Sequence, residues 1–144
     1  MRRALLALSA GAFLLNACGV LDTPTGAPAP TALAAVKTTC EVLGRAYEKN
    51  MGPFAESLTA YVADRKALPA AQKSLATFAT AVKEATATSA DAELVQAGQK
   101  SAETMQARSA DAAFFAAIKT PADVDKTVGP TLTEWLSPVQ KRCS

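Results

Sequence analysis

Apolar side chains recur every three or four residues along most of this chain, the spacing that places them on one face of an α-helix. The longest stripe of this kind follows a proline-rich stretch. It consists of Leu33, Val36, Cys40, Leu43, Tyr47, Met51, Phe54, Leu58 and Tyr61. The pattern predicts a long first helix that buries this face and keeps its charged side in solvent.

Two further stripes follow at the same spacing. The second comes after Pro69, which suits the first turn of a helix, and consists of Ala71, Leu75, Phe78 and Val82. The third begins near the polar caps Thr88 and Ser89 and consists of Leu94, Val95, Gly98, Ala102 and Met105. A restart at Ser109 would add a short helix containing Phe114, Phe115 and Ile118.

The fourth stripe opens with the strongest helix-start signal in the chain. In residues 120–123, Thr-Pro-Ala-Asp, a threonine cap, a proline at the first helical position and an acid at the third agree with one another. The face that follows consists of Val124, Val128, Leu132, Trp135, Val139 and Cys143. No segment alternates as a strand would, so the sequence predicts an all-α, up-down bundle of four helices, or five with the restart.

The core of this bundle is expected to be thin. Beyond residue 30 there are 26 large apolar side chains, and much of the remaining hydrophobic content is alanine, which buries little area per residue. Small cores of this kind usually need a covalent staple.

The segment before the first stripe has the pattern of an export signal. Arg2 and Arg3 precede an apolar run over residues 4–15, which is too short to span a membrane because a spanning helix needs about 20 residues. Residues 15–18, Leu-Asn-Ala-Cys, resemble the lipobox of bacterial lipoproteins. The resemblance implies a signal peptide over residues 1–17, lipidation of Cys18 and acylation of its amino group with a chain such as palmitate. The alternative is an ordinary secretory signal cut after Ala17.

The lipobox resemblance also predicts where the mature protein lies. Residues 18–30 would be the lipidated cysteine and a flexible, proline-rich tether, of which residues 20–30 reach about 35 Å at most. Residues 31–144 would form the bundle, held outside the cytoplasm on the cell membrane, or on the outer membrane of a cell that has one. Without Arg2 and Arg3, 13 basic residues face 13 acidic ones, and this neutral charge predicts no nucleic-acid partner.

The two remaining cysteines form an even pair once Cys18 carries lipid. Cys40 lies near the start of the first predicted helix and Cys143 at the end of the last, and in an up-down bundle these points meet at one end. Because exported domains fold in oxidising surroundings, we expect a Cys40–Cys143 disulfide. Two free buried thiols are the alternative.

Two Gly-Pro pairs suggest an apolar pocket. Pro53 lies 13 positions after Cys40, and Pro130 lies 13 positions before Cys143, so both helix breaks are expected at the same height, roughly 20 Å from the disulfide. The gap between two bent helices would be lined by Tyr47, Met51, Phe54, Val128, Leu132 and Trp135. The alternative is that these side chains simply fill the core.

Histidine is absent from the chain, which excludes Ser-His or Cys-His catalysis and imidazole metal sites. We therefore expect no metal, no cofactor and no catalytic residue. Acids two apart, such as Asp91 with Glu93 and Asp123 with Asp125, are expected to be caps and solvated turn residues. A helical enzyme that works without histidine, such as a chorismate mutase, would have to recruit Arg45, Arg65 and Arg108.

Two non-catalytic functions remain open. The preferred hypothesis is an interaction or structural module of the cell envelope that meets a protein partner, with the adjacent Phe114 and Phe115 as a candidate exposed patch. The alternative for these two residues is a helix buried on two sides. The second hypothesis is a carrier of an apolar small molecule or lipid in a cavity of the bundle.

Overall fold

The computed structural model describes residues 32–144. The predicted signal peptide, Cys18 and the tether lie outside the described residues. Over residues 32–144 the chain is all-helical, without a strand, and the elements are α1 (Ala32–Ala63), η1 (Arg65–Ala67), α2 (Leu68–Ala87), α3 (Ala92–Ala110), α4 (Ala112–Ala117), α5 (Pro121–Lys126), η2 (Thr127–Thr131) and α6 (Leu132–Cys143).

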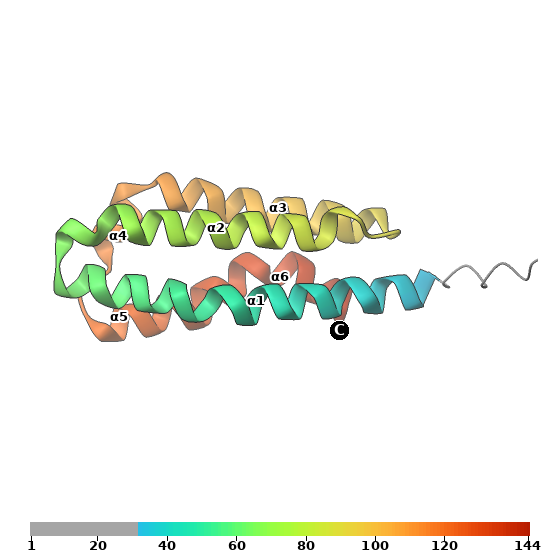
Figure 1. The fold of residues 1–144 in the computed structure, drawn as a ribbon, viewed down its shortest axis with the longest axis horizontal. Coiled ribbons are helices and arrows are strands. Elements are labelled where there is room, and N and C mark those ends of the chain that lie inside the picture. Colours follow the sequence, from blue (N-terminus) through green and yellow to red (C-terminus); the bar gives the residue numbers. More distant parts are fainter. Residues whose placement is uncertain (1–31) are drawn as a thin grey trace, which may run out of the picture.

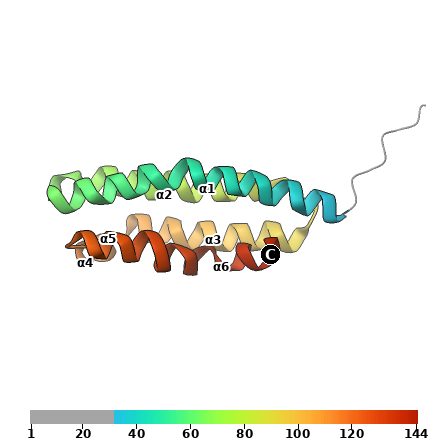
Figure 2. The ribbon, with the colours of Figure 1, turned by 90° about the horizontal axis from the view of Figure 1, so that it is seen from below.

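The helices form an up-down bundle of two layers. One layer holds α1 and α2, and the other holds α3 and the nearly continuous rod made of α5, η2 and α6 (Figures 1 and 2). The short α4 turns the chain from α3 into that rod at the end of the bundle farthest from the carboxyl terminus (Figure 1). The predicted all-α bundle is confirmed, and so is the restart of a short helix before the last one.

Side-chain caps explain where α3, α4 and α5 begin. Thr120 and Asp123 form the predicted capping box, in which the Asp123 N–H donates to the Thr120 hydroxyl over 3.2 Å and the Thr120 N–H donates to the Asp123 carboxylate over 3.0 Å. The caps of α3 and α4 are Asp91 and Asp111, two or three residues beyond the predicted Thr88, Ser89 and Ser109. An ionised carboxylate is a strong acceptor for first-turn N–H groups, so Asp91 and Asp111 cap these helices in place of the nearby hydroxyls.

The two Gly-Pro pairs behave differently. α1 stays helical through Gly52 and Pro53, both of which face solvent. Around Pro130 the helix widens into η2, a π-helical turn in which the Leu132 N–H donates to the Thr127 carbonyl. Widening accommodates a residue that lacks an N–H and whose ring crowds the preceding turn.

The core runs along the length of the bundle. Its fully buried large side chains come from every long helix, and they are Phe54, Leu58, Leu75, Phe78, Val82, Leu94, Met105, Phe115, Leu132 and Val139. Edge-to-face aromatic pairs connect α1 to its neighbours, with ring centroids 5.8 Å apart for Tyr47 and Phe78 and 6.1 Å apart for Tyr61 and Phe115.

Candidate functional site

One end of the bundle is tied together by a covalent bond. Cys40 of α1 and Cys143 of α6 form the predicted disulfide, with Cα atoms 5.7 Å apart and 103 positions between them. The up-down topology brings the start of α1 and the end of α6 to the same end (Figure 1), so neither helix has to bend to make the bond. The prediction of a disulfide joining the first and last helices is confirmed.

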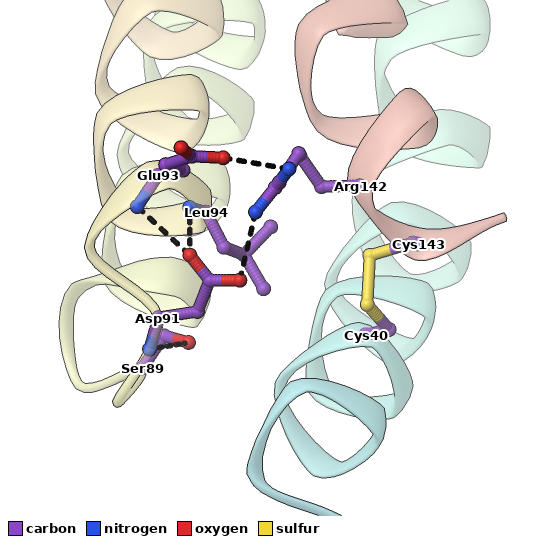
Figure 3. A network of polar contacts seen from close by, with 7 residues as sticks. All are labelled: Cys40, Ser89, Asp91, Glu93, Leu94, Arg142 and Cys143. Carbon is purple, nitrogen blue, oxygen red and sulfur yellow. Dashed lines mark hydrogen bonds and ion pairs between the residues drawn. A yellow bond between two sulfur atoms is a disulfide. The ribbon is translucent and has the colours of Figure 1, made fainter. Parts of the chain in front are cut away.

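An ionic link lies directly beside the disulfide. The Arg142 guanidinium donates to the Asp91 carboxylate over 3.0 Å and pairs with the Glu93 carboxylate at 2.6 Å (Figure 3). Arg142 therefore joins the end of α6 to the first turn of α3, while the next residue joins α6 to α1. We call these five residues, Cys40, Asp91, Glu93, Arg142 and Cys143, the clasp.

Asp91 has two structural roles within the clasp. Its carboxylate accepts the N–H groups of Glu93 and Leu94 over 2.8 and 3.1 Å, and so caps α3. The hydrogen bond from the Leu94 N–H, followed by that from Arg142, lowers the pKa of Asp91 below its ordinary value, since both favour the charged form. The ionised carboxylate is thus held where the positive end of the α3 dipole and the Arg142 charge meet.

A cavity opens next to the clasp, between α1, α2 and α6. Its volume is about 260 Å³, and it is partly enclosed. Its lining consists of Cys40, Leu43, Gly44, Tyr47, Glu48, Val82, Leu136, Val139, Gln140 and Cys143. Most of these present apolar surface, while Glu48 and Gln140 are exposed and supply polar atoms. We call this space the disulfide cavity.

The disulfide cavity exists because α1 and α6 pack poorly. α1 packs along α2, α2 along α3 and α3 along α6, whereas α1 and α6 meet over only a short stretch. Gly44, on the α1 wall, has nothing within 4 Å of the place where a Cβ atom would stand. The Cys40–Cys143 bond thus holds together α1 and α6, which contact each other little elsewhere.

The predicted pocket residues lie deeper in the bundle. Phe54, Leu132 and Trp135 belong to the buried core, and Met51, Tyr47 and Val128 pack against it. Tyr47 is the one member of this predicted set that also lines the disulfide cavity. The cavity therefore lies closer to the cysteines than the level of the two prolines.

Phe114 and Phe115 pack inward. Phe115 is fully buried, and the half-buried Phe114 packs on Phe115 and Trp135 with ring centroids 5.0 and 5.3 Å apart. The pair is therefore part of the interior, and the large apolar side chains that are exposed among the described residues are Leu33 and Val42.

The three arginines considered for an enzyme lie apart, and each has its own surroundings. Arg45 borders an open groove between α1 and α2. Arg65 donates to the Ile118 carbonyl over 2.8 Å and stacks 4.5 Å above the Tyr61 ring, and Arg108 pairs with Asp111 at 3.1 Å. These contacts give Arg65 and Arg108 structural roles at the α4 end of the bundle.

The Arg142 link and the position of the cavity were not predicted from the sequence. A signal for the link was present, because the same topology that brings Cys40 to Cys143 also brings the start of α3 to this end. Because Arg142 adjoins Cys143 and the acids Asp91 and Glu93 lie at the start of α3, this topology could have predicted their ion pairs. The cavity had no comparable signal, since apolar positions along a stripe look the same whether or not another helix covers them.

Within residues 32–144, no group of three or more cysteine and acidic side chains is placed to hold a metal ion. None of the helices described there is both long enough and apolar enough to cross a membrane.

Comparison of the chain with protein-family models, with curated proteins and with solved structures finds no match.

Proposed function

We propose that this protein is a lipid-anchored, extracytoplasmic helical module of the cell envelope that acts without catalysis, through contact with a partner protein. The observation that carries the proposal is the Cys40–Cys143 disulfide. Structural disulfides form and persist in oxidising compartments, so the bond supports a location outside the cytoplasm. The lipobox-like residues 15–18 supply the anchor at Cys18.

A groove between α1 and α2 is the surface that we assign to the partner. It has a volume of about 600 Å³, and it is lined by Val42, Arg45, Ala46, Lys49, Asn50, Thr77, Thr80, Ala81, Glu84 and Ala85. Val42, which is 37% exposed, gives it an apolar contact, and Arg45, Lys49 and Glu84 give it charges of both signs. A shallow, mixed surface of this kind suits a protein partner better than a small molecule.

The anchor is tested by growing cells that make the full chain on an alkyne-bearing analogue of palmitate. We expect the wild-type protein to incorporate the label, lose residues 1–17 and sediment with membranes. The matched variant Cys18→Ser should lose the label and leave the membrane fraction. An unlabelled, uncleaved wild-type protein in the cytoplasm would contradict the proposal.

The partner contact is tested by photo-cross-linking in intact cells. A photoreactive residue in place of Thr80, inside the groove, should give one discrete product that disappears in the Arg45→Glu background. The same residue in place of Asp125, an exposed position on α5, is the matched control and should give none. The same cross-linked products from positions 80 and 125 would contradict the assignment of the groove as the contact surface.

The disulfide cavity favours a second function, that of a carrier for an apolar small molecule or lipid. Ligand sites in helical bundles lie between helices and are mostly apolar with a few polar groups at defined points, which is the composition of this cavity. Its volume of about 260 Å³ is below that of sites for drug-sized ligands, so it fits a small or narrow molecule.

A further inference from the structure

We propose that the disulfide cavity binds a single unbranched hydrocarbon chain, the acyl chain of a lipid, which enters along α1 past the Cys40–Cys143 bond. The inference deepens the carrier function proposed above and rests on it.

The cavity offers a chain-like ligand apolar contact on several sides. Leu43 and Tyr47 of α1, which are half-buried, line it, and so do Val82 of α2 and Leu136 and Val139 of α6, which are themselves almost fully buried. The polar atoms come from Glu48 and Gln140, both of which are exposed. A ligand without polar groups along its length leaves no buried polar atom unpaired in such a place, whereas a polar ligand would lose its hydration without replacement.

The apolar surface continues on the other side of the disulfide. A second, more open depression shares Cys40 and Cys143 with the cavity and is also lined by the apolar Leu33 and Val36 and by the polar Lys37, Glu41, Arg142 and Ser144. Leu33 is 83% exposed, the most exposed large apolar side chain of the described residues. The two hollows thus follow the same side of α1, from its first turn past the disulfide and into the bundle.

The two hollows lead toward the first turn of α1, the place from which a lipid chain would come. α1 begins at Ala32, ~12 Å along the helix from Cys40. Cys18 precedes Ala32 by 14 positions, so a lipid on its sulfur would start within about 45 Å of the first turn of α1. An acyl chain attached there, or one from a neighbouring membrane lipid, has the same chemistry and reaches the same entrance.

The test of the site uses the unlipidated full chain, Cys18→Ser, titrated with the fluorescent fatty acid cis-parinaric acid. We expect saturable binding that both palmitate and the uncharged hexadecanol displace, since the chain and not the head group is recognised. Gly44→Phe fills the cavity from a position with nothing within 4 Å, and it should weaken binding by more than about tenfold. Gly52→Phe is the matched control, an exposed α1 glycine with equally open space, and it should bind as the parent does.

Far-UV circular dichroism of both glycine variants shows whether each is folded, and a folded Gly44→Phe protein that binds unchanged would overturn the proposal. Absence of saturable binding to the parent chain would overturn it as well. Neither result bears on the partner groove or on labelling at Cys18, so failure of this site and failure of the anchored module are distinguishable.

The source of the chain is identified with a photoreactive residue in place of Gln140, at the cavity, in lipidated protein on cells. Mass spectrometry of the cross-linked protein then has three readable outcomes. A gain equal to one membrane lipid means that the occupant is a neighbouring lipid. A link between the Gln140 peptide and the acylated Cys18 peptide means that the occupant is the protein's own chain. Products of neither kind would contradict a lipid occupant.

Discussion

The α2–α3 contact and the α1–α6 contact are opposite solutions to packing two helices. Between α2 and α3 the Thr86 side chain packs so closely on α3 that a Cβ atom on Gly98 would stand 1.9 Å from Thr86 Oγ1. Between α1 and α6 there is room for a cavity of about 260 Å³, and a Cβ atom on Gly44 would meet nothing within 4 Å. The α2–α3 pair is held by close packing, and the α1–α6 pair is held by the disulfide at one end.

The difference follows from the side chains at each contact. The buried residues where α2 meets α3 include Ala79, Gly98 and Ala102, whose small size allows close approach and many dispersion contacts. Along α1 and α6 the larger Leu43, Tyr47, Leu136 and Val139 line the cavity instead of filling it. A bundle with a thin core can therefore leave one side loose when a cross-link limits the entropy of the unfolded chain.

Removing the disulfide should have the largest effect on this comparison. A loop of 103 residues corresponds to about 4.7 kcal/mol in the chain-entropy treatment of cross-links. We expect the Cys40→Ser/Cys143→Ser protein to lose stability on that order in urea unfolding, relative to the oxidised wild-type protein. Amide hydrogen exchange should rise most in α6 and in the first turns of α1.

The α2–α3 contact serves as the internal control for that experiment. Its amides should keep their relative protection until global unfolding, because small buried residues and not the clasp hold it. Equal loss of protection in both contacts, with little change in stability, would show that the disulfide does not serve the α1–α6 side in particular.

The two glycines allow a test with opposite signs. Gly98→Ala should destabilise the protein by about 1–3 kcal/mol, because the new methyl group overlaps the Thr86 side chain of a closely packed neighbour. Gly44→Ala should stabilise it by about 0.5–1 kcal/mol, because alanine is the better helix former and its methyl group enters open space. Urea denaturation of the two variants measures both changes in the free energy of unfolding. Changes of the same sign would contradict the difference in packing between the α2–α3 and α1–α6 contacts.

The smallest expected effect concerns the charges of the clasp. Because the pKa of Asp91 is lowered in the folded protein, its ionised carboxylate stabilises the fold at pH values above the unfolded-state pKa of about 3.9. This stabilisation is lost as the pH falls through the folded-state pKa. Arg142→Gln should raise the pKa of Asp91 toward its ordinary value, though the Leu94 N–H still holds it lower. Carboxyl NMR titration measures this shift.

Arg108→Gln is the matched control for the charge experiment. Arg108 pairs with Asp111, whose pKa is lowered first by the Phe114 N–H and also by Arg108. This variant should raise the pKa of Asp111 and leave that of Asp91 unchanged. A shift at Asp91 in both variants would mean that the Arg142 contact is not specific.

Much of the fold was predictable because its signals are local. A stripe such as Ala71, Leu75, Phe78 and Val82 repeats at the helical period, and the Thr120–Asp123 capping box depends on residues three apart. The disulfide was predictable for a different reason, since an up-down order of helices brings the ends of the first and last together. The starts of α3 and α4 were placed two or three residues too early because serine and threonine nearby carry a similar capping signal.

The sequence by itself determined the helices, their order and the covalent bond between the first and the last, because period, caps and cysteine positions act along the chain. Only the tertiary structure decided which helix pairs pack tightly, where Arg142 finds its acids and where the cavity opens. Those outcomes depend on the volumes of side chains that meet across helices, such as Thr86 against Gly98, and a stripe of apolar positions does not specify its partner. The proposed lipid site is the space that remains between α1 and α6, because these helices are joined by a disulfide at one end and contact each other little along their length.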